Sequence, residues 1–201
     1  MKLIINNLTK KINKTIYLDI GHFEFESNKI NIINGLNGSG KTTLLLVLSL
    51  IDKDFKGSIK LFEEDKEIKY SHSNSIYVSS KNSLIEYLSL KENLNLISKV
   101  NLEEFSNFLD ININSNVSNL SGGEEELVSL FRLKNTRNRV ILLDEVTSYL
   151  DDSNLLKVFS LLEDIASLNN LIIFATHDVR VLSHYNENTI YLKNKGLINN
   201  A

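Results

Sequence analysis

Three of the eight glycines in this 201-residue chain stand within six positions, at 35, 38 and 40. They follow a strand-like run at 31–33 and come directly before Lys41, Thr42 and a leucine-rich stretch with helical spacing. Glycines let a backbone curl so that successive N–H groups point inward, and a helix N-terminus adds its positive end. The sequence therefore predicts an anion-binding loop between a buried strand and a helix.

The loop, GLNGSGKT at 35–42, matches the phosphate-binding pattern G-x-x-x-x-G-K-[ST] in its required place after a strand and before a helix. In this pattern Lys41 reaches the β- and γ-phosphates and the Thr42 hydroxyl binds Mg²⁺. A chance match in a chain of this size has a frequency on the order of one in a hundred. We therefore favour a nucleoside triphosphate site over a glycine turn that binds nothing.

A second candidate site is the segment VILLDE at 140–145, an apolar run that ends in two acids. A carboxylate at the carboxyl end of a parallel strand lies beside the loop that follows the neighbouring strand. Asp144 would then hold Mg²⁺ through water, and Glu145 would polarise the attacking water. Acids at strand ends also cap turns, but after a phosphate loop we favour the catalytic interpretation.

Between these motifs lies LSGGE at 120–124, and here the chain resembles the ATP-binding subunit of ABC transporters. Ser121 and the amides of Gly122 and Gly123 would form a second anion site at a helix N-terminus. The resemblance implies that this site contacts the γ-phosphate of ATP held by a partner subunit, so that two ATP molecules join a head-to-tail dimer. The structural alternative is a capped helix with flexible glycines.

Two further segments resemble the same family in the expected order. SYLD at 148–151 resembles its D-loop, and ATHD at 175–178 resembles its switch-histidine segment. The resemblance implies that His177 bonds the γ-phosphate and orients Glu145, so that the catalytic residues are Lys41, Glu145 and His177. The implied ligands are ATP and Mg²⁺, and the implied nucleotide contacts are Asn37, Gly38, Ser39, Gly40, Lys41, Thr42 and Thr43, with Ser121, Gly122 and Gly123.

The chain departs from the family where a glutamine usually meets Mg²⁺ or the attacking water, because Ser80 stands there and the chain contains no glutamine. A serine would reach the metal only through a water or a backbone shift. Asn82 is a possible substitute, although we favour a plain loop residue. We expect weaker metal sensing or altered coupling, with ATP binding retained.

Other departures concern the base and the helix after the LSGG motif. Ile12 stands where the family usually stacks an aromatic ring on adenine, and Tyr17 is the nearest aromatic residue. Base stacking is worth roughly 1–3 kcal/mol in nucleic-acid complexes, so affinity and base selectivity should fall if Tyr17 does not reach the base. Residues 125–127, Glu-Glu-Leu, replace the family's polar pair, and Val146 replaces a common proline.

The overall pattern predicts an α/β fold of the P-loop NTPase type, with a mainly parallel sheet, an N-terminal antiparallel β subdomain and an inserted small helical subdomain. We expect one domain, with its catalytic core at 1–83 and 118–201 and the helical part at 84–117. Capping patterns at Ser89 with Glu92, Asn101 with Glu104, and Ser121 with Glu124 mark helix starts. Strands are predicted at 2–8, 15–25, 29–33, 57–62, 75–79, 140–143 and 171–175, with a terminal strand or hairpin at 189–198. Helices are predicted after Lys41 and at 121–133 and 152–168, and a charged turn at 63–69.

Composition limits the setting of the protein. The chain has no cysteine and a formal net charge of −3, which fits a cytoplasmic protein and gives no electrostatic case for nucleic acid. The longest apolar run, 44–51, is far shorter than the ~20 residues of a membrane span, and the N-terminus lacks a secretory signal.

The leading hypothesis is an ATP-hydrolysing subunit on the inner face of the cell membrane, docked on an integral membrane permease subunit. The lack of a C-terminal extension favours an exporter type, by fold-level analogy. A homodimer would suffice, with a heterodimer of two ATPase subunits as the alternative. We expect most of five apolar residues of the helical part to be core and some to line the docking groove: Leu84, Tyr87, Leu88, Leu90 and Leu94.

Two other functions remain open from the sequence. A soluble, non-transport ATPase of the assembly type would keep the fold without a membrane partner. A nucleotide-binding regulatory module with little turnover would explain the missing glutamine, although Lys41, Asp144, Glu145 and His177 argue against it. A small-molecule kinase is least favoured, because LSGG has no role there.

Overall fold

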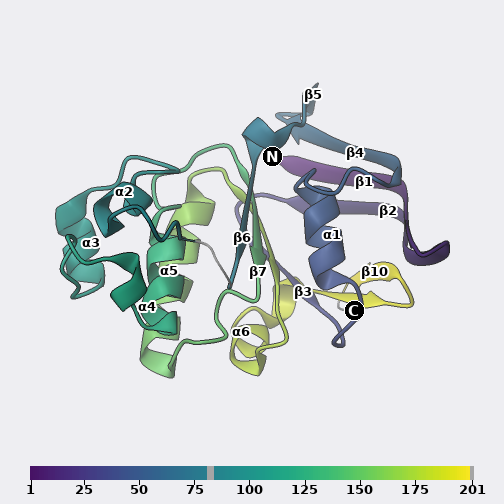
Figure 1. Ribbon diagram of the computed structural model, residues 1–201. Coiled ribbons are helices and arrows are strands. Elements are labelled where there is room, and N and C mark those ends of the chain that lie inside the picture. The colour runs from purple at the N-terminus through teal and green to yellow at the C-terminus, as the bar shows by residue number, and fades with distance from the viewer. Residues whose placement is uncertain (81–83, 200–201) are drawn as a thin grey trace.

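The computed structural model describes residues 1–80 and 84–199. Two sheets pack with helices between and beside them (Figure 1). The strands are β1 Lys2–Ile12, β2 Thr15–Glu26, β3 Ile30–Asn34, β4 Lys56–Glu63, β5 Lys66–Ile68, β6 Ser75–Ser79, β7 Val140–Asp144, β8 Leu171–Ala175, β9 Thr189–Lys193 and β10 Gly196–Asn199. The α-helices are α1 Lys41–Leu48, α2 Leu90–Leu94, α3 Leu102–Phe108, α4 Gly122–Phe131, α5 Asp152–Ser167 and α6 Val179–His184.

The smaller sheet is antiparallel, in the order β2-β1-β4-β5. β5 corrects our prediction of a turn throughout 63–69. Glu64 and Asp65 both adopt positive φ angles, and the chain reverses there so that Lys66 pairs with Glu63. Charged side chains are tolerated on this strand because it lies at the edge of the sheet, where they stay in water.

The larger sheet has the order β10-β9-β3-β8-β7-β6, and all of its pairs except β10 with β9 are parallel. Every residue of β7 and β8 is buried, as expected when helices cover both faces of a parallel sheet. The carboxyl ends of β3, β8, β7 and β6 meet at one edge. This edge therefore gathers the glycine loop, the two acids, the histidine segment and Ser80.

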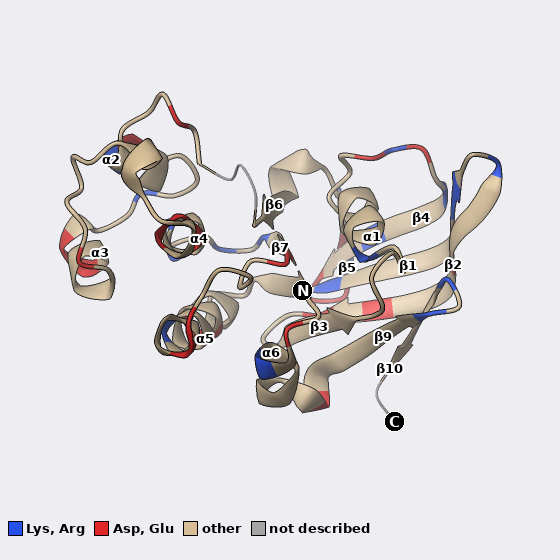
Figure 2. Cartoon of the chain, turned by 60° about the horizontal axis from the view of Figure 1, so that its bottom comes forward, with Lys and Arg blue, Asp and Glu red and all other residues tan. Residues whose placement is uncertain are grey.

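Alternate residues of β7 serve two cores. Val140 and Leu142 pack in a cluster with the apolar residues of α1 and of the antiparallel sheet. Ile141 and Leu143 pack in the other cluster, with α4 and α5. Consequently α1 lies on one side of the parallel sheet and α4 on the other, as both views show (Figures 1 and 2).

The region from 84 to 119 contains two short helices and turns. Ser89 and Glu92 form the predicted capping box of α2. Asn101 caps α3, but Glu104 does not close the predicted second box, because its carboxylate pairs with Lys134 at 2.8 Å. Of the five apolar residues considered above, Leu84, Leu90 and Leu94 are buried in the core, Leu88 is half-buried and Tyr87 is 86% exposed.

Helix α6 was not predicted. It has only six residues, which is too short for a clear 3.6-residue pattern, and its N-cap is Asp178 of the histidine segment. In the two described stretches, 1–80 and 84–199, we find no helix long and apolar enough to cross a membrane.

Candidate nucleotide site

The glycine loop leaves β3 and curls into the start of α1. Gly38 and Gly40 have φ angles of 77° and 104°, in the left-handed region that side chains disfavour. A Cβ atom on Gly40 would also lie 3.0 Å from the Tyr17 ring. Glycine therefore stands at the two positions where the tight curve of this loop requires a positive φ angle.

Lys41 points back into this loop. Its Nζ donates to the carbonyl oxygens of Gly35 at 2.8 Å and Leu36 at 3.4 Å, and the residue is 7% exposed. The Ser39 hydroxyl of the same loop is also buried and has no hydrogen-bond partner within the described chain. A buried cation and an unused hydroxyl donor are suited to an anion in the loop.

Asp144 ends β7 and is 6% exposed. Its Oδ2 accepts a 2.9 Å hydrogen bond from the Tyr77 hydroxyl, whereas Oδ1 has no partner among the described residues. Burial, reinforced by the Asp144 charge, raises the pKa of Tyr77, so the phenol stays a donor. One carboxylate oxygen is thus left without a bond at the edge where the glycine loop begins.

Ser80 reaches the same edge through its backbone. Ser79 pairs with Asp144, and the Ser80 N–H donates to the Asp144 carbonyl at 3.1 Å. The side chain of Ser80 is half-buried. Asn82, the possible substitute for the glutamine, lies outside the described residues.

Glu145 follows Asp144 with a φ of 54°, an uncommon conformation for glutamate. Its Oε1 lies 2.7 Å from His177 Nδ1 and 4.0 Å from Lys41 Nζ. Its Oε2 accepts from the Thr176 hydroxyl at 3.2 Å and the His177 N–H at 3.3 Å. The structure therefore brings Lys41, Glu145 and His177 into one cluster.

The LSGG motif contacts none of these groups. The Ser121 side chain accepts from the Glu124 N–H at 3.3 Å and donates to the Glu124 carboxylate at 2.8 Å, which is the predicted capping box. Gly122 and Gly123 pack against Tyr149. Ser121 is the N-cap of α4, and α4 and α1 lie on opposite sides of the parallel sheet (Figures 1 and 2).

Tyr17 is attached to the glycine loop. Its hydroxyl donates to the Gly38 carbonyl at 2.8 Å, and its ring lies against Gly40. Ile12, at the position of the family's adenine-stacking residue, is 40% exposed near the end of β1. We therefore assign Tyr17 a contact that the sequence did not suggest, with the loop itself.

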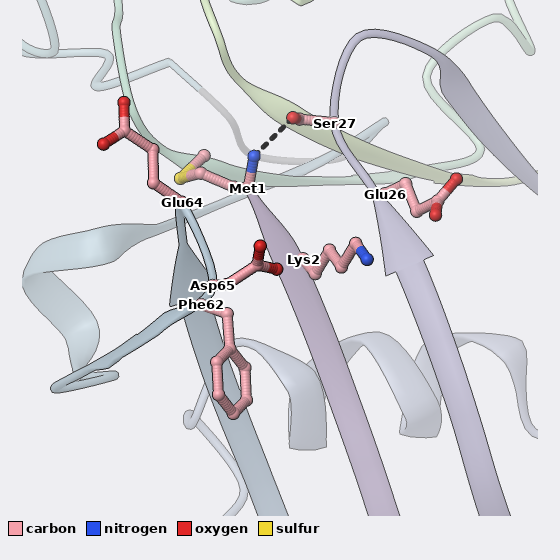
Figure 3. Close-up of a pocket in the computed structure, with 7 residues that line it drawn as sticks. All are labelled: Met1, Lys2, Glu26, Ser27, Phe62, Glu64 and Asp65. Atoms are coloured by element: carbon pink, nitrogen blue, oxygen red, sulfur yellow. Dashed lines mark hydrogen bonds between the residues drawn. The ribbon is translucent and has the colours of Figure 1, made fainter.

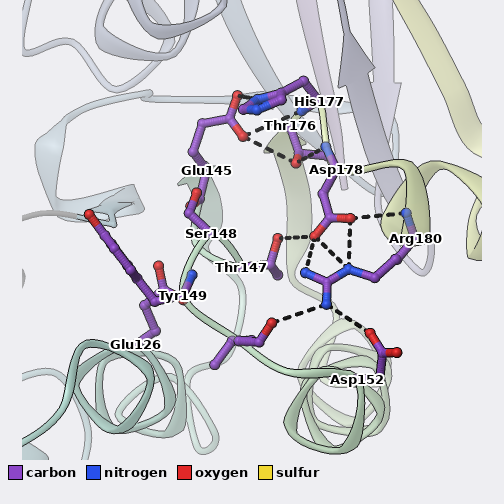
Figure 4. A network of polar contacts seen from close by, with 11 residues as sticks. Glu126, Glu145, Thr147, Ser148, Tyr149, Asp152, Thr176, His177, Asp178 and Arg180 are labelled. Atoms are coloured by element: carbon purple, nitrogen blue, oxygen red, sulfur yellow. Dashed lines mark hydrogen bonds and ion pairs between the residues drawn. The ribbon is translucent and has the colours of Figure 1, made fainter.

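Sequence reasoning missed three polar residues around this site: Tyr77, Glu126 and Arg180. Arg180 forms a forked ion pair with Asp178 that lowers the pKa of that carboxyl (Figure 4). Glu126 is 3% exposed on α4 and accepts from the Tyr149 N–H. Of the three, only Glu126 could have been singled out from the sequence, because it belongs to the Glu-Glu-Leu segment that replaces the family's polar pair.

A pocket at the opposite edge of the sheet does not belong to this site. Met1 lines this pocket, and its amine donates to Ser27 Oγ at 2.6 Å (Figure 3). Ser27 lies in the segment that precedes β3. Three carboxylates line it, from Glu26, Glu64 and Asp65. They outnumber its two cations, the Met1 amine and Lys2, so the lining is net negative and suits a phosphate less well than the glycine loop does.

Comparisons with known proteins identify the family of this chain. The ABC transporter family model matches residues 18–148, more than half of the chain. The chain is 34% identical to the tungstate uptake system ATP-binding protein TupC of Peptoclostridium acidaminophilum, over 75% of each chain. It is 25% identical to the macrolide export ATP-binding/permease protein MacB of Campylobacter jejuni, covering 89% of this chain and 31% of MacB.

A solved structure shares the fold. It is a dimeric ATP-binding cassette in a post-hydrolysis state bound to ADP and Pi, with a TM-score of 0.73, 23% identity, and coverage of 97% of this chain and 96% of that one. The predicted P-loop NTPase fold is thereby confirmed. With the family match and the geometry of the glycine loop, Asp144, Glu145 and His177, the chain belongs to the ABC transporter family as one of its ATP-hydrolysing cassettes.

Proposed function

We propose that this chain is the ATP-hydrolysing subunit of an exporter-type ABC transporter. It works on the inner face of the cell membrane, where two subunits close around ATP and energise a separate permease subunit. The observation that carries the proposal is the cluster of Lys41, Glu145 and His177 beside Asp144, with the LSGG motif on the far side of the sheet.

Each residue of the cluster has a proposed role in an in-line attack of water on the γ-phosphate. Lys41 leaves the Gly35 carbonyl and neutralises the phosphates. Glu145 orients the attacking water. To accept a hydrogen bond from that water, one of its carboxylate oxygens must release the Thr176 hydroxyl or His177 Nδ1. His177 holds Glu145 and donates to the γ-phosphate. The amides of residues 37–43, including Asn37 and Thr43, surround the remaining phosphate oxygens.

The donors present fit Mg²⁺. Asp144 Oδ1 is buried without a partner, and Thr42 stands exposed at the first turn of α1. The described residues contain no group of three or more His, Cys, Asp or Glu that could enclose a metal by itself. A site with a single carboxylate suits Mg²⁺, which takes its other ligands from phosphates and water. Mg²⁺ would supply charge neutralisation of the triphosphate, with Ser80 acting only through water.

The position of Ser121 supports the proposed dimer. Its helix lies across the sheet from the glycine loop of the same chain, so its hydroxyl and the Gly122 and Gly123 amides serve ATP on a second subunit. A homodimer has two complete sites, and a heterodimer with another ATPase subunit uses the same geometry. Ser121 must then exchange the Glu124 carboxylate for the γ-phosphate.

The permease surface is proposed on the helical part at 84–117. Tyr87 is almost fully exposed there, whereas its apolar neighbours Leu84 and Leu90 are core residues. The exporter assignment is supported by the similarity to MacB, which is named as an export protein, although TupC is named as an uptake protein.

A mixing experiment tests the composite site. Lys41→Ala disables the glycine loop, and Ser121→Asp keeps a good N-cap while placing a negative charge toward the incoming phosphate. We expect each variant to be inactive alone and part of the ATPase activity to return on mixing, because one site of each mixed dimer is intact. No recovery, from two variants that both fold and bind each other, would contradict the dimer model.

A second measurement tests closure directly. Light scattering of Glu145→Gln protein should show an ATP-dependent shift from monomer to dimer when Mg²⁺ is present, because blocked hydrolysis traps the closed state. A variant that binds ATP but stays monomeric would instead favour an obligatory partner subunit or the low-turnover module. Co-purification with a membrane protein would count against the soluble assembly ATPase.

A further inference from the structure

Residues 147–152, here called the linking segment, follow Glu145 and Val146 and end at the first residue of α5. Side chains from α4 and from α6 both form hydrogen bonds with this segment. We propose that Glu126 and Arg180 are positioning residues that clamp the linking segment, so that helix α4 and the His177–Glu145 pair move together. The inference rests on the proposed function and deepens it, because α4 carries the motif assigned to the partner's ATP.

The first contact is made from α4. Glu126 is 3% exposed, and its Oε2 accepts from the Tyr149 N–H at 3.1 Å. The same tyrosine packs on the LSGG motif: a Cβ on Gly122 would lie 3.3 Å from its ring, and one on Gly123 would lie 3.0 Å from its carbonyl oxygen. Any shift of the N-terminus of α4 must therefore carry Tyr149 with it.

The second contact is made from α6. Arg180 Nη1 donates to the Leu150 carbonyl at 3.0 Å and to Asp152 at 2.9 Å. Its Nε and Nη2 donate to Asp178, at 3.0 and 2.7 Å respectively. The planar guanidinium thus joins the linking segment to the residue next to His177, and Thr147 adds a 3.3 Å bond to Asp178 (Figure 4).

The two contacts complete a continuous path. It runs from α4 through Tyr149, Leu150 and Arg180 to the histidine segment, and ends where His177 meets Glu145 at 2.7 Å. Neither Glu126 nor Arg180 has a described contact with the glycine loop. Breaking the path should therefore lower kcat and leave the KM for ATP unchanged.

The test is a double-mutant cycle on purified full-length protein, with steady-state ATPase kinetics and melting temperature. Glu126→Leu fills the buried space without an acceptor, and Arg180→Leu removes the fork. We expect each to lower kcat about tenfold or more at unchanged KM, because small misplacements of catalytic groups cost that much. The double variant should lose no more than the worse single variant, since both break one path.

Conservative variants and controls separate positioning from folding. Glu126→Gln keeps an acceptor for Tyr149 and should recover most of the kcat lost in Glu126→Leu. The matched controls are Glu67→Leu and Arg137→Leu, which alter exposed residues away from the segment and should keep wild-type kinetics. The inference would be overturned if the factor by which kcat falls in the double variant equalled the product of the two single factors. It would also be overturned if the loss of kcat among the variants correlated with the loss of melting temperature. A wild-type chain without ATPase activity would overturn the proposed function as well.

Discussion

The Tyr77 hydroxyl holds one oxygen of the Asp144 carboxylate at 2.9 Å and leaves the other oxygen without a bond. The contact arises from sheet register. Tyr77 pairs with Leu142 and Ser79 with Asp144, so Tyr77 and Asp144 lie on one face, offset by a diagonal step between neighbouring strands. The phenol thereby fixes the direction of the carboxylate that we propose for Mg²⁺.

Tyr77→Phe should raise the Mg²⁺ concentration at which ATP binding is half-maximal, because Asp144 would then be oriented less firmly toward the metal. Loss of one hydrogen bond that orients the carboxylate is worth about 1 kcal/mol, or roughly fivefold in the half-saturating Mg²⁺ concentration. Calorimetric titration of ATP at several Mg²⁺ concentrations measures this, with Glu145→Gln also present in every protein so that ATP is not hydrolysed. Tyr70→Phe is the control, because it removes a phenol that bonds the Leu48 carbonyl at the other end of α1. Equal Mg²⁺ dependence in both variants would contradict the assignment.

Tyr17→Phe should raise the Kd for ATP by about fivefold, because its hydroxyl holds the Gly38 carbonyl of the glycine loop at 2.8 Å. The loop then becomes less ordered before it binds phosphate, and part of the binding free energy is spent on ordering it. The loss should be equal for ATP and GTP, since the hydroxyl acts on the loop. A loss confined to ATP would show that Tyr17 recognises the base instead.

The elements that carry local patterns could be predicted from the sequence. The glycine loop, the capping boxes at Ser89 and Ser121, and the buried strand that ends at Asp144 are all encoded within a few residues. Their meeting at one edge followed from the parallel order of the strands, which places the carboxyl ends of neighbouring strands together.

The remaining contacts depend on tertiary register and had no local signal. Tyr77 meets Asp144 only because β6 and β7 pair in one particular register. Arg180 lies two residues after Asp178, but its bond to Leu150 joins segments thirty residues apart. Strand β5 was missed because its charged residues resemble a turn, and Glu104 was misassigned because a distant lysine, Lys134, competes for its carboxylate.

Asn170→Ala should destabilise the fold without affecting the site. The side chain is fully buried before β8, donates to the Thr136 and Ile165 carbonyls at 2.8 and 2.7 Å, and accepts from the Arg139 N–H at 3.0 Å. Leaving these groups without partners should lower the free energy of unfolding by about 2–4 kcal/mol in urea titrations. ATP affinity of the folded fraction should be unchanged. A loss below about 0.5 kcal/mol would mean that water replaces the amide.

Glu126 should make the stability of the protein depend on pH in a defined direction. Burial, the largest cause, together with the charge of Glu125 raises the pKa of Glu126 from 4.5 to about 7, against the lowering effect of the Tyr149 and Ser148 amides. At a pH between 4.5 and about 7, Glu126 is therefore protonated in the folded state and ionised in the unfolded state. The stabilisation is fully present below pH 4.5 and is lost as pH rises through about 7, by at most about 3 kcal/mol. Urea unfolding at pH 5, 6, 7 and 8 should show wild type losing stability relative to Glu126→Gln, whereas Glu103→Gln should follow wild type. A constant difference between wild type and Glu126→Gln across this range would mean that Glu126 keeps an ordinary pKa in its buried position.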